Sequence, residues 1–313
     1  MKNQTLKLGI PNGSLVDPQR GGLKELLDRA RIFSRNIGTN APPKITNIPW
    51  LEAVVGRPQE LPALAYQGYC DIFFCGDDWA REWWLRGYKC EKLIGLDIGK
   101  VDIVVASKKP IPKGVRGFLK VATEYPYLAK EFVKGRYPAD IVEIGDMFTA
   151  RGGGAVILTS AGATEAKAYY GLADVIVEAT QSGASIANYG MKIRERIMTS
   201  ECSLYIPSEE DDPWKMQKAE RIKMMLSGVL QAKGKDLVVF NIMNTNLPRI
   251  LDYIKSNQLY ADEETLKQGP KTSEITLELL TTDTQKPLID ILGDLKDLGA
   301  TAIEGIPLSY SIR

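Results

Sequence analysis

Short apolar runs alternate with segments of helical apolar spacing over most of the chain before residue 211. Runs typical of strands occupy residues 6–10, 71–74, 101–106, 119–123, 141–144, 173–177 and 203–206. Apolar residues recur at helical spacing in residues 23–30, 61–66 and 125–134. This alternation predicts α/β units, in which helices cover a largely parallel sheet.

The order of these units predicts two lobes. The strand at residues 101–106 carries the chain into a second lobe, residues 106–196, and a later strand returns it to the first. The first lobe is therefore expected to be discontinuous, with residues 1–105 and 197–211. We expect a substrate to bind in the cleft between the two lobes.

The chain after residue 211 is predicted to form a helix and then a small α+β unit. Asp211-Asp212-Pro213 is a strong helix start, because Pro follows an acidic cap, and it predicts a linker helix over residues 212–234. The later segments alternate as strand, helix, strand, strand, helix and strand, over residues 237–243, 247–256, 265–270, 274–281, 286–298 and 301–308. This βαββαβ order predicts a ferredoxin-like domain in residues 235–313.

The stretch GLADVIVEATQSGASIANYG, residues 171–190, predicts a strand, a tight loop and a helix. The apolar run ends at Glu178, and small or polar residues follow, namely Thr180, Gln181, Ser182, Gly183, Ala184 and Ser185. Helical spacing is then kept by Ile186, Tyr189, Ile193 and Ile197. Such a loop can direct N–H groups and hydroxyls at one anion, while Glu178 can accept hydrogen bonds from a ribose diol. The stretch suits a ribose 5-phosphate; the alternative is an ordinary strand-to-helix turn with a Ser cap.

The composition limits the chemistry that is open to the protein. Its 313 residues carry a net charge of +1 and no His, so the commonest general base and metal ligand are missing. Zinc hydrolases and Ser-His-Asp mechanisms are therefore excluded. Balanced charge and the lack of a membrane-length apolar run or a signal-peptide pattern predict a cytoplasmic protein that binds neither nucleic acid nor membrane. The four cysteines lack metal-ligand spacing and are expected to be reduced core residues.

Four stretches, in the same order, are similar to the ATP phosphoribosyltransferase family, the first enzymes of histidine biosynthesis. The spacing of Glu178, Ser182, Gly183 and Ser185 resembles the family's phosphoribosyl-pyrophosphate loop. The other stretches are LGIPNGSL at residues 8–15, RPQE at 57–60 with GDDW at 76–79, and GATEAK at 162–167. The last two, together with the long C-terminal tail, resemble the long, self-regulated form of the enzyme.

This resemblance implies a two-lobed, periplasmic-binding-protein-like catalytic region and a C-terminal, ACT-like regulatory domain. It implies that adenine N1 of ATP attacks C1 of phosphoribosyl pyrophosphate and releases pyrophosphate, with Mg²⁺ held mainly by substrate oxygens. Arg57, Arg35 and Glu178 would be catalytic, and Glu178 with residues 180–185 would bind phosphoribosyl pyrophosphate. ATP would be bound by Gly13, Arg57 and Asp78.

The chain departs from the family pattern in three places. The family usually has Lys in place of Asn12, so the first turn offers no direct charge contact, and it more often has Asp in place of Glu178. The GATE motif occurs later in this chain than in the family. The extra residues, 145–158, include Gly152-Gly153-Gly154 and are interpreted as an inserted loop or hairpin. In isolation, Asp77 or Asp78 is predicted to be the N-cap of a helix that runs through Trp84.

The resemblance also implies regulation and assembly. Free histidine is expected to inhibit the enzyme by binding the C-terminal domain near Thr265 and Leu266, where that domain meets a neighbouring subunit. Dimers that assemble into a hexamer are expected. The alternative for this domain is a purely structural dimerisation unit. The alternative for the whole chain is a two-lobed protein that binds a small anion without turnover.

Overall fold

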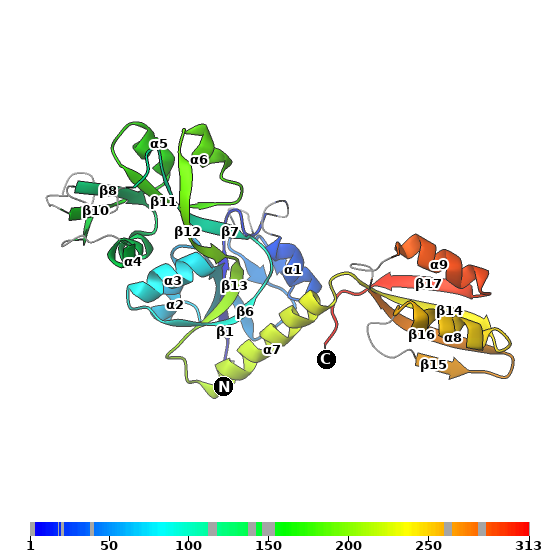
Figure 1. Ribbon diagram of the computed structural model, residues 1–313. Helices are drawn as coiled ribbons and strands as arrows, with labels where there is room; N and C mark the ends of the chain where they lie inside the picture. The colour runs from blue at the N-terminus through cyan, green and yellow to red at the C-terminus, as the bar shows by residue number, and fades with distance from the viewer. Residues whose placement is uncertain are drawn as a thin grey trace. The chain divides into compact units, whose positions relative to one another are not determined.

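The computed structural model describes residues 4–17, 19, 22–37, 41–111, 118–136, 142–145, 154–259, 265–280 and 286–312. It divides into two compact units, Met1–Lys223 and Met224–Arg313, and each contains β-sheet (Figure 1). The boundary between the units falls within helix α7 (Pro213–Gln231).

The first lobe of the first unit is built on a sheet of five described strands in the order β4-β1-β5-β13-β6. Their bounds are β1 Leu6–Pro11, β4 Leu51–Gly56, β5 Ile72–Gly76, β6 Cys90–Gly95 and β13 Cys202–Pro207. β1 is parallel to β4 and β5, whereas β13 is antiparallel to β5 and β6. The helices of this lobe are α1 Leu23–Arg29, α2 Leu61–Tyr66 and α3 Asp77–Leu85. A separate two-stranded sheet pairs β2 Ser34–Arg35 with β3 Lys44–Ile45.

The second lobe is built on a sheet of six described strands in the order β12-β7-β11-β8-β10-β9. Their bounds are β7 Val101–Ser107, β8 Phe118–Thr123, β9 Val142–Gly145, β10 Gly154–Thr159, β11 Val175–Thr180 and β12 Lys192–Ser200. β8, β9, β10 and β11 run parallel, while β7 is antiparallel to β11 and β12. The helices are α4 Pro126–Arg136, α5 Thr164–Tyr169 and α6 Ala184–Asn188. The two-lobed α/β architecture that the hydrophobic pattern predicted is confirmed.

The prediction of a helix after the loop at residues 180–185 is largely wrong. Helix α6 ends at Asn188, Gly190 takes a φ of +71°, and the chain then enters strand β12. Ile193 and Ile197, which keep helical spacing, lie on this strand. The strand forms because β7 offers a free edge with which residues 192–200 pair in antiparallel register, and such long-range pairing outweighs a short helical period.

Residues 145–158 were interpreted as an inserted loop or hairpin, and the hairpin alternative is wrong. Strands β9 and β10 flank this segment, and they pair in parallel, with Ala155 opposite Val142. A hairpin would make them antiparallel. Residues 146–153, and with them Gly152 and Gly153, lie outside the described part of the chain.

A buried carboxylate joins the two lobes on one side. Glu82, on helix α3 of the first lobe, is fully buried. It accepts hydrogen bonds from the backbone N–H groups of Tyr127 at 3.1 Å and Leu128 at 2.8 Å, in the first turn of α4 of the second lobe. Arg86 completes the contact with a 2.8 Å ion pair to Glu82. These bonds fix the first turn of α4 against α3.

The second unit has the ferredoxin-like fold that the βαββαβ order predicted. Its described strands pair in the order β15-β16-β14-β17, with antiparallel neighbours throughout. The elements are β14 Lys235–Met243, α8 Leu247–Ser256, β15 Thr265–Gln268, β16 Thr272–Leu280, α9 Leu288–Asp297 and β17 Thr301–Pro307. Val238, Phe240 and Ile242 alternate along β14 and pack with residues of α8 and α9 in one core.

Candidate functional site

Three loops of the second lobe lie together where the parallel strands of its sheet have their carboxyl ends. β11, β8 and β10 are parallel neighbours, so the residues that follow their carboxyl ends lie side by side. These residues are Glu124 after β8, the segment 160–165 after β10, and the loop 181–183 between β11 and α6. The predicted phosphoribosyl loop therefore lies beside the GATE motif.

These carboxyl ends lie on the side of the sheet where the chain crosses to the first lobe. Thr180, the last residue of β11, pairs with Asp102, one residue from Val101, which pairs with Ser200. In the first lobe, Gly76 at the carboxyl end of β5 pairs with Cys202. The strand ends of both lobes thus flank the two segments that connect the lobes.

The phosphoribosyl loop holds its own shape through hydroxyl groups. The N–H of Gly183 donates to Thr180 Oγ1 at 2.8 Å, and the N–H of Ala184 donates to Ser182 Oγ at 3.3 Å. Gly183 has a φ of +73°, and a Cβ there would lie 3.1 Å from Ile193 Cδ1. The loop thus needs glycine for its backbone, and the N–H groups of Gly183 and Ala184 are already bonded to hydroxyls of the loop itself.

Glu178 lies in a cluster of carboxylates. Burial raises the pKa of Glu178 to about 7, and the negative charges of Glu124 and Glu165 raise it further, whereas a hydrogen bond with Thr164 lowers it. Each of these partners comes from a different strand end or from helix α5. Near neutral pH, Glu178 therefore exchanges between a neutral acid and a carboxylate.

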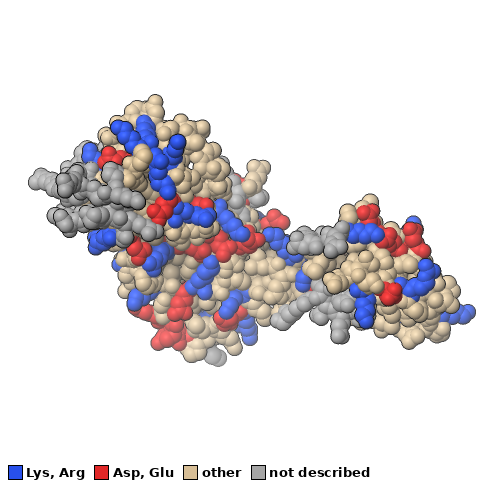
Figure 2. All heavy atoms as spheres, in the orientation of Figure 1, with Lys and Arg blue, Asp and Glu red and all other residues tan. Residues whose placement is uncertain are grey.

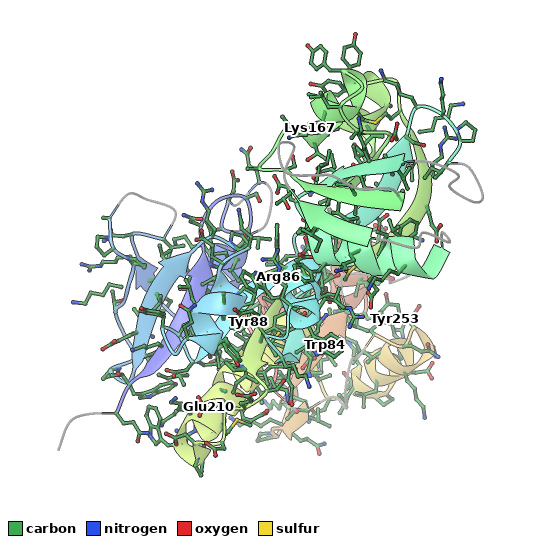
Figure 3. All side chains as sticks on the ribbon, turned by 90° about the vertical axis from the view of Figure 1, so that its left-hand side faces the viewer. Trp84, Arg86, Tyr88, Lys167, Glu210 and Tyr253 are labelled. Carbon is green, nitrogen blue, oxygen red and sulfur yellow. The ribbon has the colours of Figure 1, made fainter. Side chains whose placement is uncertain are left out.

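The GATE motif contacts the loop directly. Ser185 Oγ donates a hydrogen bond to Glu165 Oε1. Lys167, labelled in Figure 3, donates to the carbonyl oxygen of Gly162 at 2.9 Å and also to Ser160 Oγ. Glu124 accepts a 2.6 Å bond from the N–H of Gly162. Sequence reasoning assigned no role to Glu124 or Glu165; their positions just after two parallel strands were the available signal.

Arg57 and Gly13 lie at the strand ends of the first lobe. Arg57 directly follows β4, is exposed, and enters no ion pair with another residue of the described part of the chain. Gly13 follows β1, has a φ of +91°, and has open space where a Cβ would point. Because β1 and β4 are parallel neighbours, Gly13 and Arg57 lie at the same edge of the sheet.

Asp78, on α3 of the first lobe, bonds to two residues of the second lobe. Neither Asp77 nor Asp78 is the N-cap, since Gly76 caps α3 and both acids lie within the first turn. The Asp78 carboxylate is buried and accepts from Tyr125 Oη at 2.7 Å and Ser200 Oγ at 2.8 Å. Burial raises the pKa of Asp78 above its ordinary value. In this structure both oxygens of the predicted ATP ligand are already bonded within the protein.

Other predicted residues lie elsewhere. Arg35 is exposed on the two-stranded β2–β3 sheet, outside the sheet that carries Arg57. Thr265 and Leu266 are exposed on β15, an edge strand of the second unit. No group of three His, Cys, Asp or Glu side chains in the described ranges is arranged to hold a metal ion.

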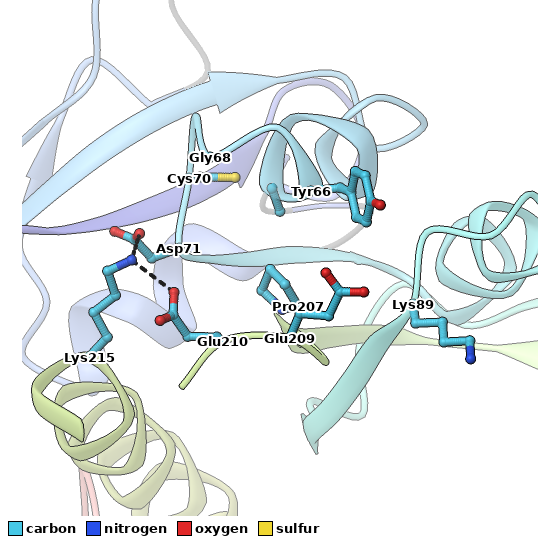
Figure 4. Close-up of a pocket in the computed structure, with 10 residues that line it drawn as sticks. Tyr66, Gly68, Cys70, Asp71, Lys89, Pro207, Glu209, Glu210 and Lys215 are labelled. Atoms are coloured by element: carbon cyan, nitrogen blue, oxygen red, sulfur yellow. Dashed lines mark hydrogen bonds and ion pairs between the residues drawn. The ribbon is translucent and has the colours of Figure 1, made fainter. Parts of the chain in front are cut away.

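A cavity of about 240 Å³ in the first lobe contains none of the predicted site residues (Figure 4). It lies near Asp71, just before β5 begins, and thus at the sheet edge opposite to Arg57. Lys215 bridges Asp71 at 2.9 Å and Glu210 at 2.8 Å in its wall. The lining holds three acidic and two basic side chains, so its net charge is negative and does not suit a phosphate, and the strand-end loops remain the candidate site.

The family model of ATP phosphoribosyltransferase matches residues 57–228. An ATP phosphoribosyltransferase from Nitratidesulfovibrio vulgaris is 32% identical over 257 residues, which cover 81% of this chain and 82% of the relative. The chain belongs to the ATP phosphoribosyltransferase family. An ATP phosphoribosyltransferase from Chlorobaculum parvum is 29% identical over 96% of this chain and 95% of its own length, so the similarity to this family includes the C-terminal unit.

Solved structures support the same fold. A chain of the ATP phosphoribosyl transferase (HisG:HisZ) complex from Thermotoga maritima superposes with a TM-score of 0.53 at 18% identity, covering 71% of this chain and 98% of that one. The family consists of transferases, and every stretch on which the resemblance was based lies within the matched region, except residues 8–15 and the C-terminal tail. Within the described ranges, no helix is both long and apolar enough to cross a bilayer.

Acidic and basic side chains are interspersed on the face in Figure 2, which fits the net charge of +1. Basic side chains gather over the second lobe where β12 runs. Lys192, Arg194 and Arg196 belong to this strand, and Arg196 pairs with Asp102 at 3.3 Å. The edge strand of this lobe is therefore charged, which hinders pairing with a further strand.

Proposed function

We propose that this member of the family condenses ATP, through adenine N1, with phosphoribosyl pyrophosphate, giving N1-(5-phosphoribosyl)-ATP and pyrophosphate in the first step of histidine biosynthesis. One observation carries the proposal: a carboxylate and a hydroxyl-rich loop follow β11 at the strand ends that flank the lobe connections, and Arg57 follows β4 at the corresponding edge of the first lobe. Substrates would bind between these two sets of loops.

The loop would bind the 5-phosphate. Thr180, Ser182 and Ser185 can exchange their present bonds for bonds to phosphate oxygens, which frees the N–H groups of Gly183 and Ala184. Gln181 lies at the exposed tip of the same loop. Glu178, once ionised, accepts hydrogen bonds from the ribose hydroxyls, as a carboxylate does in polar surroundings. The loop and the acid thereby orient C1 of the ribose.

Arg57 would act on the leaving group. Nucleophilic attack at C1 needs little proton transfer, because the ring oxygen stabilises the positive charge on the ribose while pyrophosphate departs with its negative charge. The guanidinium of Arg57 offers two parallel N–H donors that fit a phosphate. Arg35 is the second candidate for this task, and Gly13 and Asp78 remain proposed contacts of ATP. Mg²⁺ would arrive with the substrates, held mainly by their oxygens, and would neutralise phosphate charge.

Histidine inhibition is proposed for the second unit. This ferredoxin-like unit is separate from the strand-end loops of the first unit, and β15, which carries Thr265 and Leu266, is an exposed edge strand. Exposed strand edges recruit further strands, so β15 suits a contact with a neighbouring subunit at which histidine could bind. Dimers that assemble into a hexamer are part of this proposal.

The test of the reaction is direct. The full-length protein is mixed with ATP, phosphoribosyl pyrophosphate and Mg²⁺, and released pyrophosphate and the N1-substituted product are measured together. We expect both in equal amounts and neither without ATP. Tight binding of phosphoribosyl pyrophosphate without pyrophosphate release would instead favour the anion-binding alternative.

A further inference from the structure

Asn12 carries an oxygen atom that nothing in the described structure satisfies. Its Oδ1 is buried and has no hydrogen-bond donor among the described residues, while its backbone N–H donates to the carbonyl oxygen of Gly56 at 3.0 Å. Buried acceptors are costly when they are left unpaired, and native proteins leave few of them. In the described ranges, the other unpaired buried side-chain oxygen is Ser34 Oγ, on the separate β2–β3 sheet.

The position of Asn12 links this oxygen to the candidate site. Asn12 directly follows β1, the strand that lies between β4 and β5. Its neighbours at the strand ends are therefore Arg57 on one side and Asp77 on the other. Farther along the turn, Leu15 lies next to Gly99, where the chain leaves the first lobe.

The surroundings favour a ligand rather than a missing protein contact. Gly13 has open space around the position of a Cβ, so the turn can be approached by another molecule. Arg57, on the adjacent strand end, has an exposed guanidinium for phosphate. A carbonyl oxygen repels phosphate oxygens, so the substrate group that we expect to satisfy Asn12 is a hydrogen-bond donor and not a phosphate. Ribose hydroxyls and the amino group of adenine are such donors.

We propose that Asn12 is a substrate-specificity residue whose Oδ1 accepts a hydrogen bond from a neutral N–H or O–H donor of a substrate, either a ribose hydroxyl or the adenine 6-amino group. This inference rests on the proposed function. In this proposal, Arg57 binds the charged phosphate, whereas Asn12 recognises the neutral hydrogen-bond donor of the substrate. A site built to accept such a bond rejects an analogue that lacks the donor, because the buried oxygen is then left unpaired.

The test compares ligands that differ in one donor. Calorimetry measures the dissociation constants of ATP, 2′-deoxy-ATP, 3′-deoxy-ATP and purine riboside triphosphate, and of ribose 5-phosphate and 2-deoxyribose 5-phosphate. The full-length protein and its Asn12→Ala variant are compared. We expect the wild-type protein to bind one analogue about tenfold more weakly than its parent, and Asn12→Ala to bind that pair alike. The analogue that shows this coupling identifies the donor.

Two further variants separate recognition from folding. Asn12→Asp keeps an acceptor and should keep the discrimination, even where added charge weakens all triphosphates. Asn257→Ala removes an exposed amide in the second unit and should change no ratio. Equal weakening of every ligand by Asn12→Ala, or no change at all, overturns the assignment of Asn12 and leaves the proposed function intact. Failure of the wild-type protein to bind both ATP and ribose 5-phosphate overturns the proposed function and this inference with it.

Discussion

At the scale of single residues, Glu178 combines a proposed substrate contact with a cost to stability. Burial, together with the negative charges of Glu124 and Glu165, raises the pKa of its carboxyl group from the ordinary value of 4.5 to about 7 in the folded protein. The folded state therefore holds this proton more tightly than the unfolded chain does. The contribution of Glu178 to stability is largest below pH 4.5 and is lost as the pH rises through about 7.

Glu178→Gln should therefore make the protein more stable at high pH relative to wild type. Gln cannot ionise, so the variant keeps the unfolding free energy that the wild-type protein loses above about pH 5. We expect the difference in unfolding free energy to grow by up to about 3 kcal/mol in favour of the variant between pH 5 and pH 8. Urea unfolding at four pH values measures this. Parallel pH profiles for the two proteins would mean that Glu178 is ionised like an exposed acid.

Arg57 should contribute to turnover rather than to the fold. It is exposed and makes no ion pair within the described residues, so Arg57→Ala should leave the unfolding free energy nearly unchanged. Loss of one preorganised donor at the leaving group should lower kcat by roughly 10²–10³. Single-turnover kinetics with saturating ATP measure this step. Unchanged chemistry with weaker ATP binding would make Arg57 a positioning residue, and Arg35→Ala serves as the comparison variant.

At the scale of elements, the contact between α3 and α4 fixes one side of the lobe pair. Glu82 is fully buried and satisfies the first N–H groups of a helix that belongs to the other lobe. Arg86 neutralises it, and the Arg86 guanidinium also lies over the rings of Trp83 and Tyr127. Figure 3 labels Arg86 near the boundary between the lobes. Relative motion of the lobes must therefore pivot at α3 and α4 or break these bonds.

Glu82→Ala should destabilise the first unit strongly. The substitution leaves the N-terminal N–H groups of α4 without an acceptor and the charge of Arg86 without a partner. We expect the free energy of unfolding to fall by about 3 kcal/mol. Glu131→Ala is the matched control, because it breaks the exposed Arg81–Glu131 pair of 2.7 Å between the same two helices. That variant should cost less than about 1 kcal/mol. Similar losses of unfolding free energy in urea for the two variants would show that the buried Glu82 contributes no more to stability than the exposed Glu131.

At the scale of the whole molecule, the two units should separate catalysis from inhibition. A chain that ends at Lys233 keeps all of α7, which ends at Gln231, and removes the ferredoxin-like unit. It loses the bond from Ser311 N–H to the carbonyl oxygen of Gly228, so some loss of stability is expected. We expect the truncated protein to remain active and to be insensitive to millimolar histidine, which inhibits the full-length protein.

The control for this truncation is the mode of inhibition. If histidine acts through the second unit, substrates and histidine oppose each other's binding by linkage without sharing a site. Inhibition of the full-length enzyme should then persist at saturating phosphoribosyl pyrophosphate. A truncated enzyme that is still inhibited competitively would place histidine in the active site.

The sequence by itself determined those elements whose signals are local. Helix α7 begins at Pro213 as predicted, because Asp212 Oδ1 accepts from the N–H of Trp214 at 2.8 Å, and capping needs only neighbouring residues. Helix α2 at Leu61–Tyr66 and helix α8 at Leu247–Ser256 match their predicted ranges, since each follows from apolar spacing and a Pro in the first turn. The same holds for the βαββαβ order of the second unit.

Only the tertiary structure decided features whose partners are remote in the chain. Residues 192–200 form a strand because β7 pairs with them, although their own spacing fits a helix. Asp78 is withdrawn from solvent by Tyr125 and Ser200, and the pKa of Glu178 depends on acids from other strand ends. A sequence pattern records which residues are neighbours along the chain, whereas pairing, burial and charge depend on the neighbours that folding brings together.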